Sequence, residues 1–351
     1  MTNVSISLEA GAGILILAII VVDVVVTTLT LGGGGPITSR LSAGVWQLAL
    51  RLRRWSGRRG FLGVMGWGLL IAIALLWFVG LWMGWVLIFD STKTGVVTSS
   101  NKLPATFWET VYFTGYTLST LGLGDYQPNG VIWMIATSIA SMSGFFLVTL
   151  TFAYLLPVIG AATQRRQLAL YISSLGGTPD EIIARAWTGK GFGELSQHLI
   201  SLSPMVIQQG ENHLTYPILH YFHTVDRSRA IALSIVCLDE ALTLLNYGVA
   251  REFRPDPSAL ESCRRANAAF LKTLKSAFIT PDSDWPDAPP LDLLRRYGIP
   301  TVSEAEFLDA IKQDSIAQRR HLLLALVRND GWTWDAVASS HTTNRSQRLD
   351  D

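Results

Sequence analysis

The chain has 351 residues, of which 49% are hydrophobic and 16% are charged, and its formal net charge at pH 7 is +1. Apolar runs fill the part before residue 160 and charged residues concentrate after it, which indicates a membrane protein with one further, soluble domain. This distribution excludes a wholly soluble protein, and the near-neutral charge gives no reason to expect a nucleic-acid partner.

The first apolar run covers residues 11–31 and is long enough to cross a bilayer. Asp23 lies inside this run, where a carboxyl group is costly and should face the protein interior or a polar partner. A proton or ion site would explain it, but we favour an interhelical hydrogen bond, because no other polar group clusters with Asp23. Glycines and Pro36 follow, so residues 1–36 are predicted to form an N-terminal transmembrane helix.

Residues 37–60 carry arginines but no acidic residue, and we expect them to lie on the membrane rather than cross it. The arginines are Arg40, Arg51, Arg53, Arg54, Arg58 and Arg59. Apolar residues recur every three or four positions, at Ile37, Leu41, Val45, Leu48, Leu52 and Trp55. This spacing predicts an amphipathic helix whose basic part, residues 40–59, contacts anionic lipid headgroups. A solvated basic linker is the alternative.

A second run without charges, residues 61–89, is predicted to span the membrane. The arginines before it place its start in the cytoplasm by the positive-inside rule. The first span then runs from outside to inside, which puts the N-terminus outside. No cleavable signal peptide is expected, because residues 1–10 contain no Lys or Arg.

A short helix is predicted to begin at residues 103–106 and to end near Ser119. The sequence TLSTLGLGDY, residues 117–126, covers its end and the loop that follows. Gly122 and Gly124 let alternate residues adopt left-handed conformations at little steric cost. Such a backbone can aim successive carbonyl oxygens to one side, where rings of oxygens from several chains replace the water shell of an ion.

This motif resembles the pore signature Thr-x-Gly-x-Gly-Asp of tetrameric potassium channels, and it is most similar to the second pore loop of two-pore-domain potassium channels. The matching residues are Thr120, Gly122, Gly124 and Asp125. The resemblance covers residues 61–157 and implies an outer helix, a re-entrant pore helix, a filter and an inner helix. An ordinary turn is the alternative, which the helix before the motif and the apolar runs around it disfavour.

The resemblance also implies roles for individual residues. The selectivity filter would consist of Thr120, Leu121, Gly122, Leu123 and Gly124, with potassium held by the first four carbonyls and by the Thr120 hydroxyl. Asp125 would cap the outer mouth, and Leu121 and Leu123 would pack behind the filter. Filter support is expected from Tyr112, Phe113 and Tyr116. Leu123 lacks the hydroxyl of the tyrosine that is commoner there, so one brace of the filter is absent.

A turn is expected at residues 127–130, and a third apolar run, residues 131–158, is predicted to return to the cytoplasm as the inner helix, ending at Pro157 and Gly160. Gly144 follows the first filter glycine by 22 residues, close to the position of the family's hinge glycine. A gating hinge and close helix packing are both open for Gly144.

The chain contains one pore signature, and one loop supplies a quarter of a filter, so the resemblance implies a homotetramer with fourfold symmetry. The leading hypothesis is a potassium-selective channel, not an enzyme, gated by an unidentified signal through the soluble domain. A non-selective monovalent cation channel and a membrane-anchored sensor with a vestigial pore are the alternatives. A potassium uptake transporter subunit is disfavoured, because that class uses four related pore loops in one chain.

Residues 161–340 are predicted to form an all-α cytosolic domain, followed by a disordered polar tail over residues 341–351. Helix starts are indicated at Thr178 and Ser303. The apolar run at 230–250 resembles a further span, but Asp239 and Glu240 at its centre favour a core helix. The two cysteines, Cys237 and Cys263, are expected to be buried thiols rather than a disulfide.

Four residues within a short stretch could bind a metal ion or protons: Glu211, His213, His220 and His223. His220 and His223 share a face if the stretch is helical. We favour ordinary polar and aromatic packing, because tight metal sites show more regular ligand spacing. No cofactor is expected besides potassium ions in the filter.

The predicted fold class is therefore an all-α membrane protein. An extra N-terminal span precedes the potassium channel pore domain of residues 61–160, and an all-α domain follows it. We expect three spans in the plasma membrane, in a bacterium the inner membrane, with the C-terminal domain in the cytoplasm.

Overall fold

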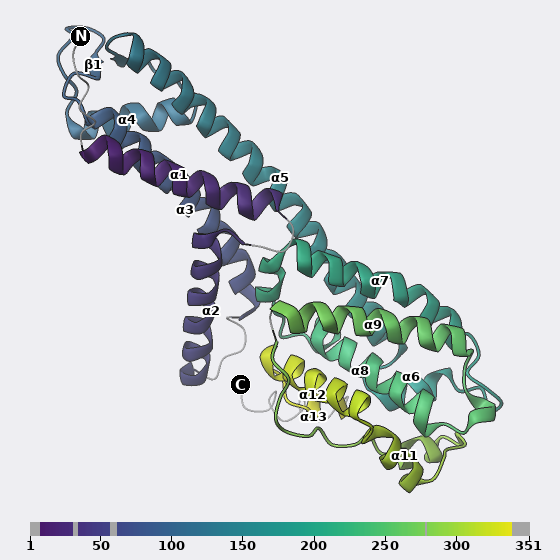
Figure 1. Cartoon of the computed structure of the whole chain (residues 1–351). Coiled ribbons are helices and arrows are strands. Elements are labelled where there is room, and N and C mark those ends of the chain that lie inside the picture. Colours follow the sequence, from purple (N-terminus) through teal and green to yellow (C-terminus); the bar gives the residue numbers. More distant parts are fainter. Residues whose placement is uncertain (1–7, 31–33, 57–61, 278, 339–351) are drawn as a thin grey trace, which may run out of the picture. The chain divides into compact units, whose positions relative to one another are not determined.

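The computed structural model describes residues 8–30, 34–56, 62–277 and 279–338, most of which are helical (Figure 1). The chain divides into two units, one formed mainly by the N-terminal part up to Ile159 and the other mainly by the part from Gly160 onwards. The predicted tail, residues 341–351, and the end of the basic segment, Arg58 and Arg59, lie outside the described residues.

The first unit contains the long apolar helices. They are α1 (Leu8–Leu29), α3 (Leu62–Asp90) and α5 (Val131–Leu175), all long and apolar enough to cross a membrane. The helix predicted over the basic segment is α2 (Pro36–Ser56), and the predicted short helix is α4 (Phe107–Leu118). The helix α5 continues past Pro157 and Gly160, where the span was expected to end, as far as Leu175. A proline removes only one hydrogen bond of a helix, and the rest of the ladder carries α5 past it.

Two short strands were missed in the sequence. Strand β1 (Val96–Thr98) pairs antiparallel with β2 (Tyr126–Pro128), with Val97 opposite Gln127. The second strand overlaps the turn expected at residues 127–130. Three-residue strands carry too little alternation to be recognised, and this pair exists because the loops on either side of α4 lie next to each other.

The Asp23 carboxylate is fully buried and joins three helices. Its Oδ1 accepts hydrogen bonds from the backbone N–H groups of Ile37 (2.7 Å) and Thr38 (3.1 Å), at the start of α2. Its Oδ2 accepts one from the Trp77 indole of α3 (2.8 Å). A Cβ on Gly35 would clash with this carboxylate, so glycine is required there. The predicted interhelical hydrogen bond of Asp23 is confirmed, and it serves as a cap for α2.

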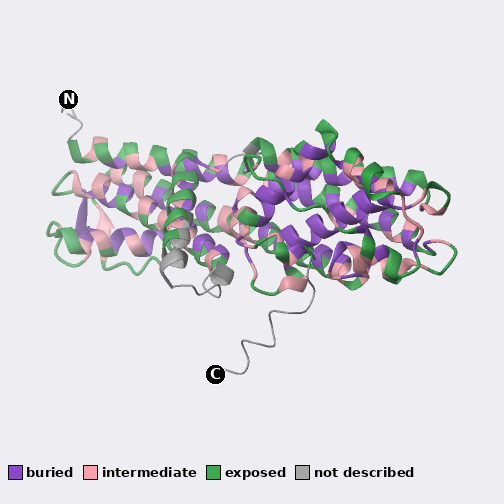
Figure 2. Cartoon of the chain, turned by 90° about the horizontal axis from the view of Figure 1, so that it is seen from below, coloured by how far each residue is buried: buried purple, intermediate pink, exposed green. Residues whose placement is uncertain are grey.

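The second unit is built around α8 (Ile231–Thr243), every residue of which is buried. The other helices of this unit are α6 (Pro179–Ala186), α7 (Leu195–Thr215), α9 (Pro257–Ala277), α10 (Leu291–Arg296), α11 (Glu304–Ile311), α12 (Asp314–Asn329) and α13 (Asp335–Ala338). Of these, α6, α9, α12 and α13 contact α8, α10 contacts α6, and α11 contacts α12. Figure 2 shows buried residues on the inner sides of these helices. In the apolar stretch Ile231–Gly248, which starts with α8, 89% of the residues are buried. In the apolar windows of α1, α3 and α5 this share is 22–33%, so the burial confirms that α8 is a core helix.

Local predictions in this unit also hold. The Thr178 and Ser303 hydroxyls accept hydrogen bonds from the backbone N–H groups three residues later, as N-caps of α6 and α11. Cys237 and Cys263 are free and buried, and burial raises the pKa of each thiol to about 12.

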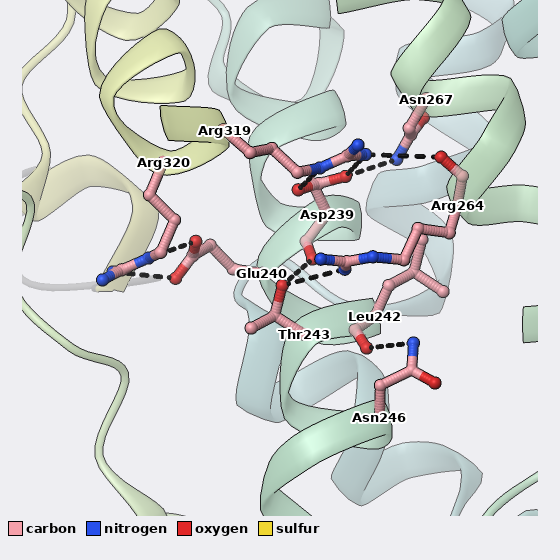
Figure 3. Close-up of polar contacts among 9 residues, drawn as sticks. All are labelled: Asp239, Glu240, Leu242, Thr243, Asn246, Arg264, Asn267, Arg319 and Arg320. Carbon is pink, nitrogen blue, oxygen red and sulfur yellow. Dashed lines mark hydrogen bonds and ion pairs between the residues drawn. The ribbon is translucent and has the colours of Figure 1, made fainter. Parts of the chain in front are cut away.

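Two buried ion pairs join α8 to α12 (Figure 3). The Arg319 Nε lies 2.7 Å from Asp239 Oδ2, and the Arg320 guanidinium contacts both Glu240 oxygens at 2.9 and 3.1 Å. Asn267 of α9 donates a further hydrogen bond to Asp239 (3.3 Å). Consecutive acids thus meet consecutive arginines, so no charge of the core helix is left unpaired among the described residues.

We expect Arg320→Leu to destabilise the second unit by about 3–5 kcal/mol, because it leaves the Glu240 carboxylate buried without its partner. The double variant Arg320→Leu/Glu240→Leu should regain most of that loss. The exposed pair of Arg265 and Glu261 provides the control, since Arg265→Leu should cost no more than about 1 kcal/mol. Thermal unfolding of the full chain in detergent measures all three, and equal effects of Arg320→Leu and Arg265→Leu would contradict the prediction.

Candidate ion pore

The pore loop begins at the N-terminus of α4, which is held by Glu109. Its Oε2 accepts hydrogen bonds from the Thr106 backbone N–H (2.7 Å) and hydroxyl (2.8 Å). Its Oε1 accepts one from the Tyr126 hydroxyl (2.7 Å), which belongs to β2. One carboxylate therefore caps α4 and ties its start to the strand that follows the predicted filter.

The chain leaves α4 through a tight turn and enters the predicted filter. The backbone N–H of Leu121 donates to the Tyr116 carbonyl (2.9 Å), and that of Thr120 donates to the Thr117 carbonyl (3.1 Å). The C-terminal end of α4, which carries partial negative charge, thus leads directly into residues 120–124 and favours a cation there.

Every second residue of the filter segment has a left-handed backbone. The φ angles are 59° at Thr120, 59° at Gly122 and 87° at Gly124. Among the described residues other than glycine, Thr120 shares a positive φ only with Lys102. A left-handed backbone at Gly122 and Gly124 is what the glycine spacing predicted, and such an alternation can aim successive carbonyls to one side.

The filter segment is open in a single chain. Within the described part of the chain, the carbonyls of residues 120–123 accept no hydrogen bond. The side chains of Leu121 and Leu123 are 64% and 49% exposed, so one chain alone does not cover the back of the filter. The packing expected for these two leucines requires atoms from outside the chain.

The outer end of the filter is held from two sides. The Tyr112 hydroxyl of α4 donates to Asp125 Oδ2 (3.2 Å). From the other side, Ser99 follows β1, and its backbone N–H donates to the Asp125 carbonyl (2.9 Å) while its hydroxyl donates to the Gly124 carbonyl. The predicted mouth residue is therefore next to Tyr112, as an aromatic support requires.

The other two predicted support residues lie next to each other on α4, with ring centroids 5.5 Å apart, but they make different further contacts. The Tyr116 hydroxyl donates to the Tyr126 carbonyl (2.8 Å), so Tyr116 contacts both ends of the filter loop. Phe113 is buried, and its ring centroid lies 5.2 Å from that of Phe89, so it packs against α3. Tyr112 and Tyr116 thus touch the filter loop directly, whereas Phe113 anchors α4 to the outer helix.

Gly144 lies where α5 passes the end of α4. A Cβ at this position would lie 2.8 Å from the carbonyl carbon of Leu118 and still closer to its oxygen. Close packing is therefore established for Gly144, and the hinge stays a prediction.

The three predicted histidines come together, but not as a metal site. His213, His220 and His223 line a small cavity with Arg165 and Asp330, and Glu211 lies outside it, exposed on α7. His223 Nδ1 is 2.6 Å from Asp330 Oδ1. Among the described residues, no group of three His, Cys, Asp or Glu side chains has the geometry to hold a metal ion. The described residues therefore give no support to the metal alternative.

The condition for a shared helix face of His220 and His223, a helix that contains both, is not met. The segment Pro217–Tyr221 is a short 3₁₀ helix, and His223 lies beyond its end. α7 ends at Thr215, before Pro217, and so does not continue into this stretch.

The sequence analysis did not identify two residues that contact the pore loop, Glu109 and Ser99. The Glu109 contact with Thr106 has a local signal, the capping-box spacing, whereas its contact with Tyr126 does not. Ser99 had no signal, because it lies 25 residues before Gly124 in a polar stretch.

Comparisons with known proteins agree with this geometry. A family model described as an ion channel matches residues 72–160, which contain α4, the filter segment and Gly144. The chain is also 34% identical over 303 residues to the uncharacterized membrane protein YdjJ of Bacillus subtilis (strain 168), covering 86% of this chain and 87% of that protein. No solved structure matches.

We predict that Gly144→Ala disrupts the pore part, because the added Cβ would overlap the last carbonyl of α4. Gly160→Ala, in the same helix, has nothing within 4 Å of its Cβ and should be neutral or slightly stabilising. The test compares the thermal unfolding midpoints and the yields of folded protein of the two variants. Equal behaviour would show that Gly144 is not required for packing.

We also predict that acid destabilises the second unit. Burial, together with Arg165, holds the pKa of His213 well below its usual value, and burial and His223 lower that of His220 to about 3. The unfolded chain takes up these protons near pH 6.5, so stability is lost as pH falls below that value, by about 2 kcal/mol per histidine at pH 5. His220→Gln should flatten the fall of the unfolding midpoint between pH 7.5 and 5, and His198→Gln, at a partly exposed site, should not.

Proposed function

The chain belongs to the same family as the membrane protein YdjJ and contains an ion-channel segment, and from this we propose that it is a homotetrameric, potassium-selective channel. Residues 120–124 would form one quarter of the filter, with Asp125 at its outer mouth. Potassium ions would be held by the carbonyls of residues 120–123 and by the Thr120 hydroxyl. No further cofactor is proposed.

The alternating left-handed backbone at Thr120, Gly122 and Gly124 carries this proposal. A β-branched residue such as Thr120 rarely adopts a positive φ, and a conformation of this cost persists at sites where the surrounding structure holds it for function. A row of carbonyls aimed to one side is the arrangement that replaces the water shell of a cation. The motif of the potassium channels is the feature that favours potassium among cations.

Exposed apolar surface around the filter supports a tetramer. Leu121 and Leu123 are exposed, and so are Phe145, Phe152 and Leu156 of α5, each more than 60%. These three share one side of α5, at i, i+7 and i+11. Four copies around an axis would cover the leucines and place the α5 residues along a central cavity.

The continuity of α5 supports gating from the second unit. This helix contains Gly144 beside α4 and continues to Arg165 and Leu175. Arg165 is buried, and its guanidinium donates to the Leu219 carbonyl and lies 3.7 Å from Asp330. A rearrangement of the second unit would therefore act on the helix that lines the pore, in response to a signal that stays unidentified.

We further propose the orientation implied by the charges. The exposed side chains of Arg40 and Arg51 on α2 would contact anionic headgroups at the cytoplasmic face of a bacterial inner membrane. The second unit would then be cytoplasmic, and the filter mouth would open outwards, with three spans formed by α1, α3 and α5.

A non-selective cation channel is the second candidate. Leu123 has no hydroxyl, so it cannot donate a hydrogen bond from the filter to the aromatic residues behind it. A filter with fewer braces holds its carbonyls less rigidly, which would weaken discrimination between potassium and sodium.

The reversal potential of the purified protein in planar bilayers, with potassium on one side and sodium on the other, distinguishes these candidates. We expect reversal near the potassium equilibrium potential. Reversal near zero with clear current would favour the non-selective channel. A protein that stays silent when its second unit is destabilised at pH 5 would favour the membrane-anchored sensor with a vestigial pore.

We predict that Gly124→Ala abolishes or broadens potassium selectivity without preventing assembly. Its Cβ would meet nothing within 4 Å, so the effect would come from strain at a φ of 87°. Gly189 has the same φ and the same open surroundings in the second unit, and Gly189→Ala is therefore the matched control. Currents of normal size and selectivity in Gly124→Ala would overturn the filter assignment. Gly122→Ala should likewise abolish flux in an assembled protein.

A further inference from the structure

The segment before α4 folds back onto the exit of the predicted filter. β1 pairs with β2, and the chain then turns so that the Thr98 N–H donates to the Leu103 carbonyl (2.9 Å). Lys102, with a φ of 60°, forms part of this turn. The strand pair and the turn together fix the position of Ser99, which lies between them.

Ser99 uses both of its donors on consecutive carbonyls of the filter exit. Its backbone N–H donates to the Asp125 carbonyl (2.9 Å), and its hydroxyl donates to the Gly124 carbonyl. Ser99 therefore forms hydrogen bonds with both of the peptide groups that follow Gly124. Tyr112 also contacts Asp125, but through the carboxylate and not through the backbone.

The filter segment needs such an anchor at this end. Its inner end follows α4 and is held by the hydrogen bond from the Leu121 N–H to the Tyr116 carbonyl. Its outer end contains Gly124, whose φ and ψ have little intrinsic preference, so the peptide after it can rotate at low cost. The peptide before Gly124, which carries the Leu123 carbonyl, can likewise turn about the unrestricted φ of Gly124 unless the peptide after it is held in place. The Leu123 carbonyl is one of the proposed potassium ligands.

We propose that Ser99 is a positioning residue for the filter, whose hydroxyl fixes the Gly124 carbonyl and so keeps the outermost ion-binding carbonyls in place. This inference rests on the proposed potassium conduction. It assigns a role in selectivity to a residue outside the pore signature and outside α4.

The test is the sodium-to-potassium permeability ratio of the full-length channel, measured from reversal potentials in planar bilayers. Ser99→Ala removes the hydroxyl and keeps the backbone N–H, so the ratio should rise several-fold, at most roughly tenfold, the scale of one lost hydrogen bond. Ser99→Thr keeps the hydroxyl and should retain the wild-type ratio. Ser100→Ala, at the exposed neighbouring serine, is the matched control and should leave the ratio unchanged.

Size-exclusion chromatography in detergent checks assembly. If Ser99→Ala does not assemble, Ser99→Cys takes its place, since a thiol is of similar size but a weaker donor. Potassium-selective wild-type current with an unchanged ratio in the assembled variant would overturn the role of Ser99 alone. A ratio that rises equally in Ser99→Thr or Ser100→Ala would also overturn it. Wild-type current without potassium selectivity would instead refute the proposed function on which the role rests.

Discussion

The left-handed backbone at Thr120, Gly122 and Gly124 is the constraint on which the pore part depends. Glycine tolerates this conformation but does not enforce it, and threonine disfavours it. The conformation must therefore be imposed from outside the segment. The end of α4 holds one side through the Tyr116 carbonyl, and β1, Tyr112 and Ser99 hold the other. The pairing of β1 with β2, although only three residues long, places Ser99 next to the end of the predicted filter.

The spacing of Gly122 and Gly124 predicted where the backbone can adopt the left-handed conformation, but it did not predict the same conformation at Thr120 or the contacts that impose it. The sequence also predicted α4 and the core character of α8, where acids at the centre of an apolar run argued against a membrane span. The partners of these residues could not be predicted. Arg319 and Arg320 lie 80 residues from the acids that they neutralise, and Trp77 lies 54 residues from Asp23. Hydrogen bonds between distant segments depend on the packed fold, and residue spacing carries no signal for them.

The histidine cluster shows the opposite outcome. Closeness in the sequence offered a metal site as the less favoured alternative, yet α7 ends at Thr215 and His223 pairs with Asp330, the residue after α12. The three imidazoles line a small cavity together with Arg165. A cation next to buried imidazoles disfavours both protonation and metal binding, because each adds positive charge where solvent cannot screen it.

The position of Gly144 bears on where α5 can bend. A hinge needs room for the backbone to rotate, but Gly144 is packed against the last carbonyl of α4, and bending there would have to separate two helices in contact. Pro157 lacks an N–H group, so the Ala153 carbonyl has no partner from the next turn of the helix. Gly160 follows within the same turn, with nothing within 4 Å of its missing Cβ. The residues from 157 to 160 are therefore the part of α5 that bends at the lowest cost. Since the chain divides into its two units between Ile159 and Gly160, a bend there would change the direction of α5 without disturbing the contact of Gly144 with the end of α4.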